Sequence, residues 1–451
     1  MLELFMKKHY LLILATLCLF VMVSSSFASN YGDSYGYSTK GMSLGNAMSA
    51  RVDDWSSVYY NLAGLGKTRG LENGKNQIGL AYQGNMPVFD IDISRADGDG
   101  NALSTGGDQD LETGTLILGL ALDANILMNM PSFISSARLG VGVTINDDMT
   151  AVKINDLDPR THNFMRYGRE AQRLEVLSGM GFGFMDDLFG FGLGINSGFG
   201  GDGVVILEDI DLDTEAQSPR GQAKMDMTLE PNLLFGMYFS PGKMIESLEG
   251  LDFGFTFRDE TILDIYPFET TGVTNVGAFP LNMMLALNDY FQPRMYVLGA
   301  SYATETWTLS FDLEYQEWSG FKMSDPMTEN FQADLVEFDD IFIPRVGLET
   351  KINPWLNLLF GYYYQPSFVP DEAVAGVMNY LDNDKHVASA GLTLDVSEIL
   401  PIKGHTELCL GYQLQYLVDR DVTKTAPTSF NPDYSYGGTC HTVMMELNIN
   451  L

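Results

Sequence analysis

Apolar and polar residues alternate with a period of two over most of the chain beyond residue 75. The stretch 306–319 is the clearest case, because its odd positions from 307 carry Trp307, Leu309, Phe311, Leu313 and Tyr315. The stretches 405–419 and 438–451 follow the same pattern. This alternation predicts β-strands with one apolar and one polar face. Transmembrane β-barrels and soluble β-sandwiches both contain such strands, so the period alone does not separate them.

The connections between the expected strands are of two lengths. We expect about fourteen strands, a number typical of barrel proteins, at 75–93, 112–124, 137–149, 171–185, 188–204, 223–240, 250–264, 293–303, 306–319, 341–352, 355–366, 386–396, 405–419 and 438–451. Short turns at 186–187, 304–305 and 353–354 alternate with long polar loops at 94–111, 150–170, 204–222, 265–292, 320–340, 367–385 and 420–437. Short turns at one end and long loops at the other are typical of outer-membrane barrels. The pattern therefore predicts an all-β protein, a 14-stranded antiparallel transmembrane β-barrel.

The first residues have the features of a secretory signal. Lys7 and Lys8 precede the apolar run 11–23, and the small residues Ser26 and Ala28 follow it. We expect cleavage after Ala28, so that residues 1–28 are a signal peptide and the mature chain starts at Ser29. The apolar run is too short to span a membrane as a helix.

A different kind of segment lies between the signal and the first strand. Residues 41–66, GMSLGNAMSARVDDWSSVYYNLAGLG, are rich in small side chains that allow close backbone packing. Asp53 or Asp54 can cap a short helix through residues 55–61, and Gly64 or Gly66 can end it. This predicts a compact non-strand element ahead of an all-β body, as an internal plug requires.

The same segment resembles the N-terminal plug of FadL-type outer-membrane transporters, the fatty-acid and aromatic-hydrocarbon channels. The match lies in Gly41, Gly45, Ala50, Val52, Asp53, Asp54, Ser57, Val58, Tyr59, Tyr60, Asn61, Ala63, Gly64 and Leu65. This chain has Leu62 where the family has proline within Asn-Pro-Ala. Further resemblances lie at 344–349 and 381–386. The resemblance implies a plug at 29–73, with Asp53, Asp54 and 60–64 as plug residues, inside a barrel at 74–451.

Composition and charge restrict the partners. The formal net charge is −33 and only 19% of residues are charged. So acidic a chain argues against nucleic acid and anionic lipid as partners. The acidic loops are expected to hold divalent cations loosely, such as those that bridge lipopolysaccharide. Cys409 and Cys440 flank the last hairpin, in which antiparallel pairing places Cys440 opposite residue 417, so no disulfide is expected.

Glycines gather on one face of the third, fourth and fifth strands. If the apolar residues of 137–149 face lipid, Gly140 and Gly142 face the lumen, as do the alternate glycines in 179–183 and 190–198. So many glycines leave volume against the wall. Two interpretations stay open: the plug packs there, or a passage opens beside the third strand. The resemblance implies a lateral opening in that strand, with Gly140 and Gly142 as candidates.

The expected loop 265–292 contains an apolar group in an extracellular position. Exposed apolar clusters often mark binding surfaces, and methionine adapts to varied ligand shapes. The resemblance implies a surface groove that captures substrate. The alternative is a loop that packs on itself. We take the candidate ligand-binding residues to be Ile265, Tyr266, Phe268, Phe279, Met283, Met284 and, within the lumen, Arg345.

Signals for catalysis and metal binding are weak. Arg345 is expected to pair with Asp312 or Glu314 on the neighbouring strand more readily than with a ligand. The mature histidines lack metal-ligand spacing, and no Gly-x-Ser-x-Gly motif is present. The run 97–101 is similar to a calcium loop but lacks its glycine and glutamate. No catalytic residue, metal site or cofactor is predicted.

The resemblance implies passive uptake of hydrophobic molecules, either long-chain fatty acids or hydrocarbons. Capture in a surface groove, a lumen pocket and lateral exit near the third strand would be its steps. We expect a monomer in the Gram-negative outer membrane, in contact with its lipid and lipopolysaccharide. A structural or adhesive barrel and an outer-membrane lipid hydrolase are the alternatives, the second resting on a pair such as His441 with an inward serine.

Overall fold

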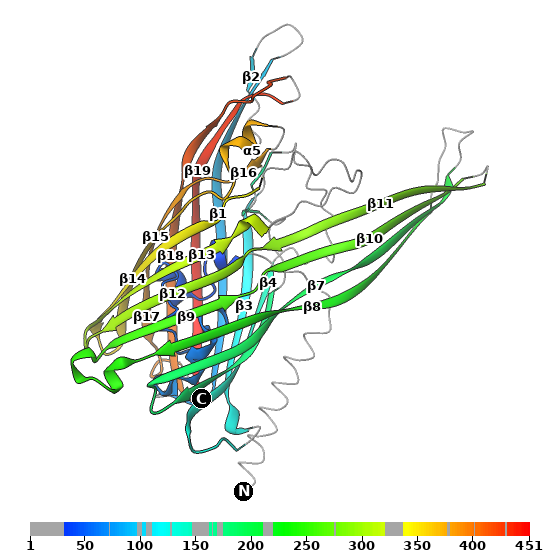
Figure 1. Cartoon of the computed structure of the whole chain (residues 1–451). Coiled ribbons are helices and arrows are strands. Elements are labelled where there is room, and N and C mark those ends of the chain that lie inside the picture. The colour runs from blue at the N-terminus through cyan, green and yellow to red at the C-terminus, as the bar shows by residue number, and fades with distance from the viewer. Residues whose placement is uncertain are drawn as a thin grey trace.

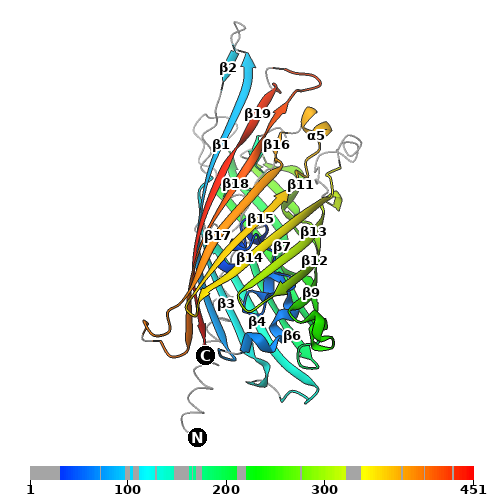
Figure 2. The same ribbon diagram turned by 90° about the vertical axis from the view of Figure 1, so that its left-hand side faces the viewer.

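The computed structural model describes residues 31–71, 73–96, 102–104, 111–126, 129–146, 162–164, 166–168, 175–210, 220–274, 277–320, 337–376, 379–400, 402–428 and 431–451. Strands tilt around a central axis and enclose a group of short helices (Figures 1 and 2). The predicted signal peptide and the calcium-like run 97–101 lie outside the described residues. No helix in these ranges is long and apolar enough to cross a membrane.

Fourteen antiparallel strands close into a barrel, which confirms the predicted fold class. They are β1 (Gln77–Ala96), β3 (Thr113–Asp123), β4 (Ile134–Asn146), β6 (Glu175–Phe184), β7 (Phe189–Ile210), β8 (Arg220–Phe239), β9 (Leu251–Arg258), β12 (Arg294–Ala303), β13 (Trp307–Glu317), β14 (Ile341–Asn353), β15 (Leu356–Gln365), β17 (Lys385–Asp395), β18 (His405–Val422) and β19 (Tyr434–Asn450). β1 pairs with β19 from Gln77↔Asn450 to Ile93↔Tyr434 and so closes the ring. Closure leaves no unpaired sheet edge.

The expected loop at 265–292 is wrong, because the chain there continues as strand. β10 (Thr261–Thr274) and β11 (Gly277–Gln292) form a hairpin that prolongs β9 and β12. β10 also pairs in parallel with the outer part of β7. The sheet β8–β7–β10–β11 therefore projects from one side of the barrel (Figure 1). We call it the projecting sheet. Pairing with the distant β7 stabilises extended backbone between Ile265 and Thr274, which explains the difference from the expected loop.

The outer surface of the barrel is apolar. Along β13 the odd positions Leu309, Phe311 and Leu313 are exposed on the outside, while Ser310 and Asp312 are buried inside. Trp307, Tyr362, Tyr412 and Tyr416 are also exposed. Trp318, which follows β13, is only 4% exposed and faces inward from a 3-10 turn, η7 (Trp318–Gly320).

The register of the last hairpin keeps the two cysteines apart. Cys440 pairs with Gln415, and Cys409 pairs with Glu446, so six residues of β18 separate the two levels. Both thiols are free and buried. Gln415, the partner of Cys440, is two residues from the predicted partner position at 417. The two cysteines are still too far apart for a disulfide.

Within residues 31–71, five short helical elements precede β1 in the lumen and form the plug. They are α2 (Tyr31–Ser34), α3 (Thr39–Ser43), α4 (Ser57–Tyr60), η1 (Leu62–Gly66) and η2 (Thr68–Leu71). The predicted helix through 55–61 is shorter than expected. Asp54 accepts bonds from the amide and hydroxyl of Ser56 before α4, and the helix ends at Asn61 rather than at a glycine. Asn61 caps η1 by accepting the Ala63 amide, which redirects the chain.

Trp55 joins the plug to the closing seam of the barrel. Its indole Nε1 donates to Asn448 of β19 at 2.7 Å, and its amide donates to Gln77 of β1 at 2.5 Å. The indole lies directly on Gly79 of β1 and Gly119 of β3, where any Cβ would overlap it. One fully buried side chain therefore contacts both strands of the seam.

We expect Trp55→Ala to destabilise the folded barrel by about 3–5 kcal/mol, because it removes a large buried ring and leaves a cavity at the seam. Urea unfolding followed by tryptophan-independent circular dichroism measures the change. Trp355→Ala is the control, since Trp355 is 56% exposed on the outside. Equal unfolding midpoints for the two variants would contradict a role of Trp55 in closure.

Candidate functional site

The plug packs directly on barrel backbone through inward glycines. In the described residues, every barrel strand except β13 and β19 carries at least one glycine at which an added Cβ would come within 3.0 Å of a plug atom. These glycines are Gly79, Gly119, Gly140, Gly142, Gly179, Gly181, Gly183, Gly192, Gly194, Gly236, Gly254, Gly299, Gly347, Gly361, Gly391 and Gly411. We call them the glycine belt. Their lack of side chains lets plug and wall approach as closely as two backbones allow.

The two strands without a belt glycine bind the plug through polar side chains. Asp312 of β13 accepts the amides of Met48 and Ser49 at 3.0 and 2.9 Å and the Ser49 hydroxyl at 2.7 Å. On β19, Glu446 accepts the Thr39 amide at 2.5 Å. These carboxylates satisfy plug backbone donors that are buried away from water.

Gly140 and Gly142 belong to this belt. A Cβ at Gly140 would lie 2.4 Å from Val58, and one at Gly142 would lie 2.5 Å from the Tyr37 hydroxyl. β4 pairs without interruption with β3 from 138 to 146 and with β6 from 136 to 144. The volume that the glycines leave is therefore filled by plug side chains. Of the two interpretations of these glycines, the contacts support plug packing.

The family-type plug residues come together around the turn after α4. The Asn61 amide group donates to Ser49 and Met237 carbonyls at 2.7 and 2.8 Å, which joins plug to β8. Leu62 packs on belt glycines of β6 and β7. Leu62 is the first residue of η1, a position that also suits the proline found in the family. Leucine can therefore stand there without loss of the turn. Tyr60 donates its hydroxyl to Asn46 at 2.8 Å.

Charge anchors the short-turn end of the plug. Asp53 pairs with Arg69, and Arg138 of β4 donates to four plug carbonyls, those of Asp53, Gly64, Leu65 and Gly70. Burial opposes the charge on Asp53, but the Arg69 and Lys40 cations outweigh it and hold the pKa of this carboxyl below its ordinary value. Burial lowers the pKa of Lys67 to about 8, although its ammonium donates to the Ala50 carbonyl at 2.5 Å.

Arg345 forms the predicted strand-to-strand pair. Its Nη2 lies 3.0 Å from Glu314 Oε1, and its guanidinium lies over the Tyr363 ring at 4.7 Å. Among the described residues, no hydrogen-bond partner is found for its other guanidinium nitrogens, Nε and Nη1. Arg345 lines a polar cavity of about 30 Å³ between plug and wall, large enough for a water. Asp33, Asp312 and Arg258 also border this cavity, so Arg345 is mainly part of the plug interface.

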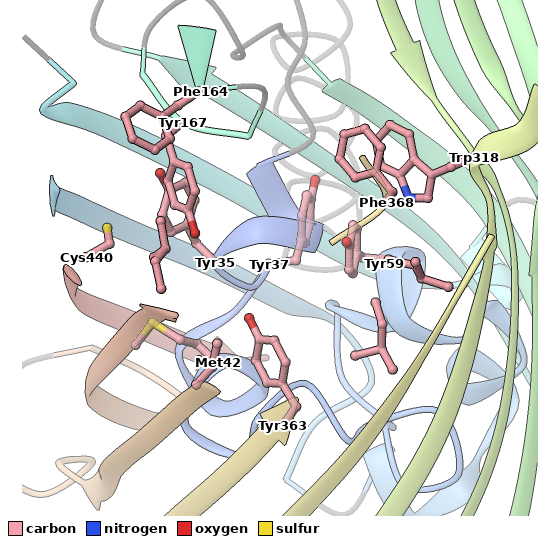
Figure 3. Packing of buried hydrophobic residues seen from close by; sticks show 14 of the residues in the cluster. Tyr35, Tyr37, Met42, Tyr59, Phe164, Tyr167, Trp318, Tyr363, Phe368 and Cys440 are labelled. Atoms are coloured by element: carbon pink, nitrogen blue, oxygen red, sulfur yellow. The ribbon is translucent and has the colours of Figure 1, made fainter. Parts of the chain in front are cut away.

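Above the plug the lumen is filled by aromatic side chains, which the sequence did not indicate as a site. Tyr35 of the plug lies edge-on to Tyr167 with ring centroids 6.2 Å apart, and Tyr37 stacks on Tyr59 at 4.7 Å. Trp318 stacks on Phe368 with ring centroids 3.7 Å apart (Figure 3). These residues form one buried cluster that extends from plug to mouth. The alternation could not find them, because most lie outside regular strands.

Lys385 is a second residue that the sequence did not indicate. The predicted strand at 386–396 begins one residue after Lys385, which is the first residue of β17. Its side chain is 1% exposed, and its ammonium lies 3.4 Å from both the Tyr167 hydroxyl and Gln415 Oε1. The lumen above the plug is thus aromatic with isolated polar groups, as ligand sites commonly are.

The predicted capture residues lie on the projecting sheet. Paired positions of a sheet share a face, so the register places Ile265 and Phe268 with Gly201 and Gly203 of β7. Met283 and Phe279 pair with Thr270 and Gly272 on that same face, whereas Met284 pairs with Glu269 on the opposite one. Tyr266 falls within a register shift. The set is therefore divided between two faces.

The histidines of the last strands face outward. His441 Nδ1 bonds the Tyr412 hydroxyl at 2.7 Å, and His386 Nδ1 bonds the Tyr362 hydroxyl at 2.8 Å. His441 thus pairs with an outer tyrosine rather than with an inward serine. Within the described ranges no three His, Cys, Asp or Glu side chains are grouped for metal binding.

The architecture is that of FadL-type channels, a 14-stranded barrel with an N-terminal plug in its lumen. Among solved structures, a Pseudomonas aeruginosa FadL homologue superposes with a TM-score of 0.56 at 12% identity, over 92% of this chain and 98% of that chain. The CymD monoaromatic hydrocarbon channel gives a TM-score of 0.53 at 12% identity, over 94% and 99%. At such identities the likeness establishes the fold.

Among curated proteins, alkane uptake protein A of Marinobacter nauticus is 27% identical over 229 residues. The match covers 46% of this chain and 47% of that protein, so the chain spans about half the length of the curated relative it matches. No family model matches the sequence.

The glycine belt makes a direct prediction. A Cβ at Gly361 would lie 2.0 Å from the Gly45 amide nitrogen, a backbone atom that cannot move aside alone. We expect Gly361→Ala to displace the plug and to raise the rate of trypsin cleavage in the plug about tenfold, a change that corresponds to about 1.4 kcal/mol. Folded protein in detergent is the sample, and mass spectrometry maps the cleavage sites.

Gly84→Ala is the matched control, because Gly84 is also a strand glycine but has nothing within 4 Å of an added Cβ. Unchanged protection of the plug in Gly361→Ala would show that plug and wall tolerate separation, contrary to the tight contact.

Proposed function

We propose that this protein is an outer-membrane channel for passive uptake of hydrophobic molecules, long-chain fatty acids or hydrocarbons. The observation that carries the proposal is a plugged barrel with an apolar outer surface and an aromatic lumen, in a chain related to an alkane uptake protein. Burial of apolar cargo would drive the process, at about 25 cal/mol per Å² removed from water.

In this proposal the projecting sheet captures cargo outside the cell. The register gives this sheet one almost wholly apolar face, made of positions Val205, Leu207, Met225, Met227, Ile265, Phe268, Phe279, Met283, Leu285 and Leu287. The other face includes Arg220, Lys224, Asp226 and Glu269. The apolar residue types at one set of paired positions support contact with a hydrophobic ligand.

Transit would follow the aromatic cluster toward the plug. The plug fills the barrel at the level of the glycine belt, so cargo requires a rearrangement of the plug or an exit through the wall. We propose the lateral exit near β4 as the second half of the route. Movement of Val58 and Leu65 away from Gly140 would uncover backbone there, which supports this location.

Phe268→Ser tests capture. Uptake of radiolabelled hexadecane and of oleate by cells that express the variant should fall about tenfold relative to wild type, if one aromatic anchor contributes about 1.4 kcal/mol or more to capture. Glu269→Ser is the control, because the register places position 269 on the opposite face.

A deletion strain with no uptake defect on either substrate would contradict the proposed function itself. Equal uptake by Phe268→Ser and wild type, with equal amounts of folded protein, would contradict only capture by this face.

A further inference from the structure

On the outer wall, the apolar band of β17 and β19 ends at two histidines. These strands lie side by side with β15 and β18 (Figure 2). The outward positions within 443–449 of β19 are all apolar, and His441 is the next outward residue. The outward positions within 388–394 of β17 are also apolar, and His386 is the next outward residue. The surface therefore changes from apolar to polar at matching positions of the two strands.

The height of the histidines above the short turns matches the thickness of a membrane. His441 lies nine residues along β19 from Asn450, which is paired with His405 at the start of β18. At about 3.4 Å per residue and a strand tilt of about 40°, this segment rises about 23 Å. The apolar band of an outer-membrane barrel is about 25 Å tall. His386 and His441 therefore lie at the level of the lipid head groups, on the side of the long connections.

Each histidine is hydrogen-bonded to a tyrosine of the neighbouring strand. His386 Nδ1 lies 2.8 Å from the Tyr362 hydroxyl, and His441 Nδ1 lies 2.7 Å from the Tyr412 hydroxyl. The register places each tyrosine two residues nearer to the short turns than the position opposite its histidine. The same diagonal geometry therefore occurs twice, between β15 and β17 and between β18 and β19.

Further residues join the two pairs into one row. Tyr416 of β18 is opposite both His386 and Thr439. His441 Nε2 lies 3.4 Å from the Thr439 hydroxyl, and the rings of Tyr364 and His386 lie 5.2 Å apart. With neighbouring strands about 4.8 Å apart, the row from β15 to β19 is about 14 Å wide, which suits a lipid head group rather than a single ion. We call the following residues the histidine row: Tyr362, Tyr364, His386, Tyr412, Tyr416, Thr439 and His441.

The histidine row offers aromatic rings and uncharged hydrogen-bonding groups. Tyrosine hydroxyls and neutral imidazoles can both donate and accept. Because the two imidazole nitrogens point to different sides of the ring, a tyrosine on Nδ1 directs Nε2 away from itself. The row includes no lysine or arginine, and Asp384, which accepts the Tyr364 hydroxyl at 2.6 Å, lies beside it. Such a set of groups suits sugar hydroxyls better than phosphates.

We propose that the histidine row binds the glucosamine head group of lipopolysaccharide in the outer leaflet. His386, Tyr412 and Tyr416 are exposed, so their rings can lie against a sugar while their polar atoms bond its oxygens. The site goes beyond the proposed function, because it depends on the placement of the barrel in an outer membrane and not on what the channel carries.

Native mass spectrometry of the folded protein in detergent tests the site, with lipid A, the membrane anchor of lipopolysaccharide, as the probe. We expect the double variant His386→Phe, His441→Phe to raise the Kd for lipid A about tenfold, which corresponds to about 1.4 kcal/mol. Phenylalanine keeps a ring at each position and removes its hydrogen bonds. His386→Gln, His441→Gln restores a donor and an acceptor at each position, and we expect an intermediate Kd.

Tyr296→Phe, Tyr315→Phe is the matched control. By alternation both tyrosines face outward, on β12 and β13, with ring centroids 6.2 Å apart. This variant also loses two outward polar groups, and its Kd for lipid A should equal that of wild type. Gel migration with and without boiling confirms that each variant is folded. An unchanged Kd in the folded His386→Phe, His441→Phe protein, or an equal rise in the control, would overturn the proposal.

Two further probes identify the part of the lipid that is bound. Dephosphorylated lipid A should bind the wild type as tightly as lipid A does, whereas phosphatidylglycerol, an anionic lipid without a sugar, should bind about tenfold more weakly. Lost binding of the dephosphorylated probe would indicate a phosphate site, and equal binding of phosphatidylglycerol would indicate a general lipid contact. Either result would overturn the sugar site. Neither bears on uptake of hydrophobic cargo, so the two proposals fail separately.

Discussion

The close contact between the plug and the barrel backbone determines most of this structure. A barrel of this size encloses more volume than short strand side chains can fill, so something must occupy the lumen or water will enter. At the level of the glycine belt the wall carries glycines, and plug side chains fill the space that strand side chains would otherwise occupy. Leu44, Leu62 and Trp55 occupy positions that a strand residue would otherwise fill. Plug and barrel therefore share a single core.

Because plug and barrel share a core, charged side chains in the lumen bind backbone groups of the plug. Asp312 and Glu446 are carboxylates on strands without a belt glycine, and they accept plug amides that no strand could pair. Arg138 serves the opposite need, since it donates to plug carbonyls. Such buried charges stabilise only the inserted plug, because each would lack a partner if the plug left. Large plug movements are therefore costly.

The sequence predicted the parts of the fold that repeat. Period-two alternation and short turns gave the barrel and its strand order, because every wall residue has only two environments, lipid or lumen. It failed where this rule ends, because 265–292 pairs as a hairpin although we expected a loop there. The helix after Asp54 ends early because Asn61 bonds distant carbonyls, which no local pattern reveals.

The candidate site was less predictable than the fold for the same physical reason. The glycines at 140, 142 and 179–194 are evident in the sequence. A glycine on a strand indicates only that another group packs closely against the backbone. The structure identifies that group as the plug. The belt glycines of β8, β9, β12, β14, β15, β17 and β18 occur singly, one in each of these strands, so no local cluster marked them. Arg166, Trp318 and Phe368 meet from three separate connections between strands. Contacts of this kind depend on closure of the whole barrel, so no single segment of the sequence reveals them.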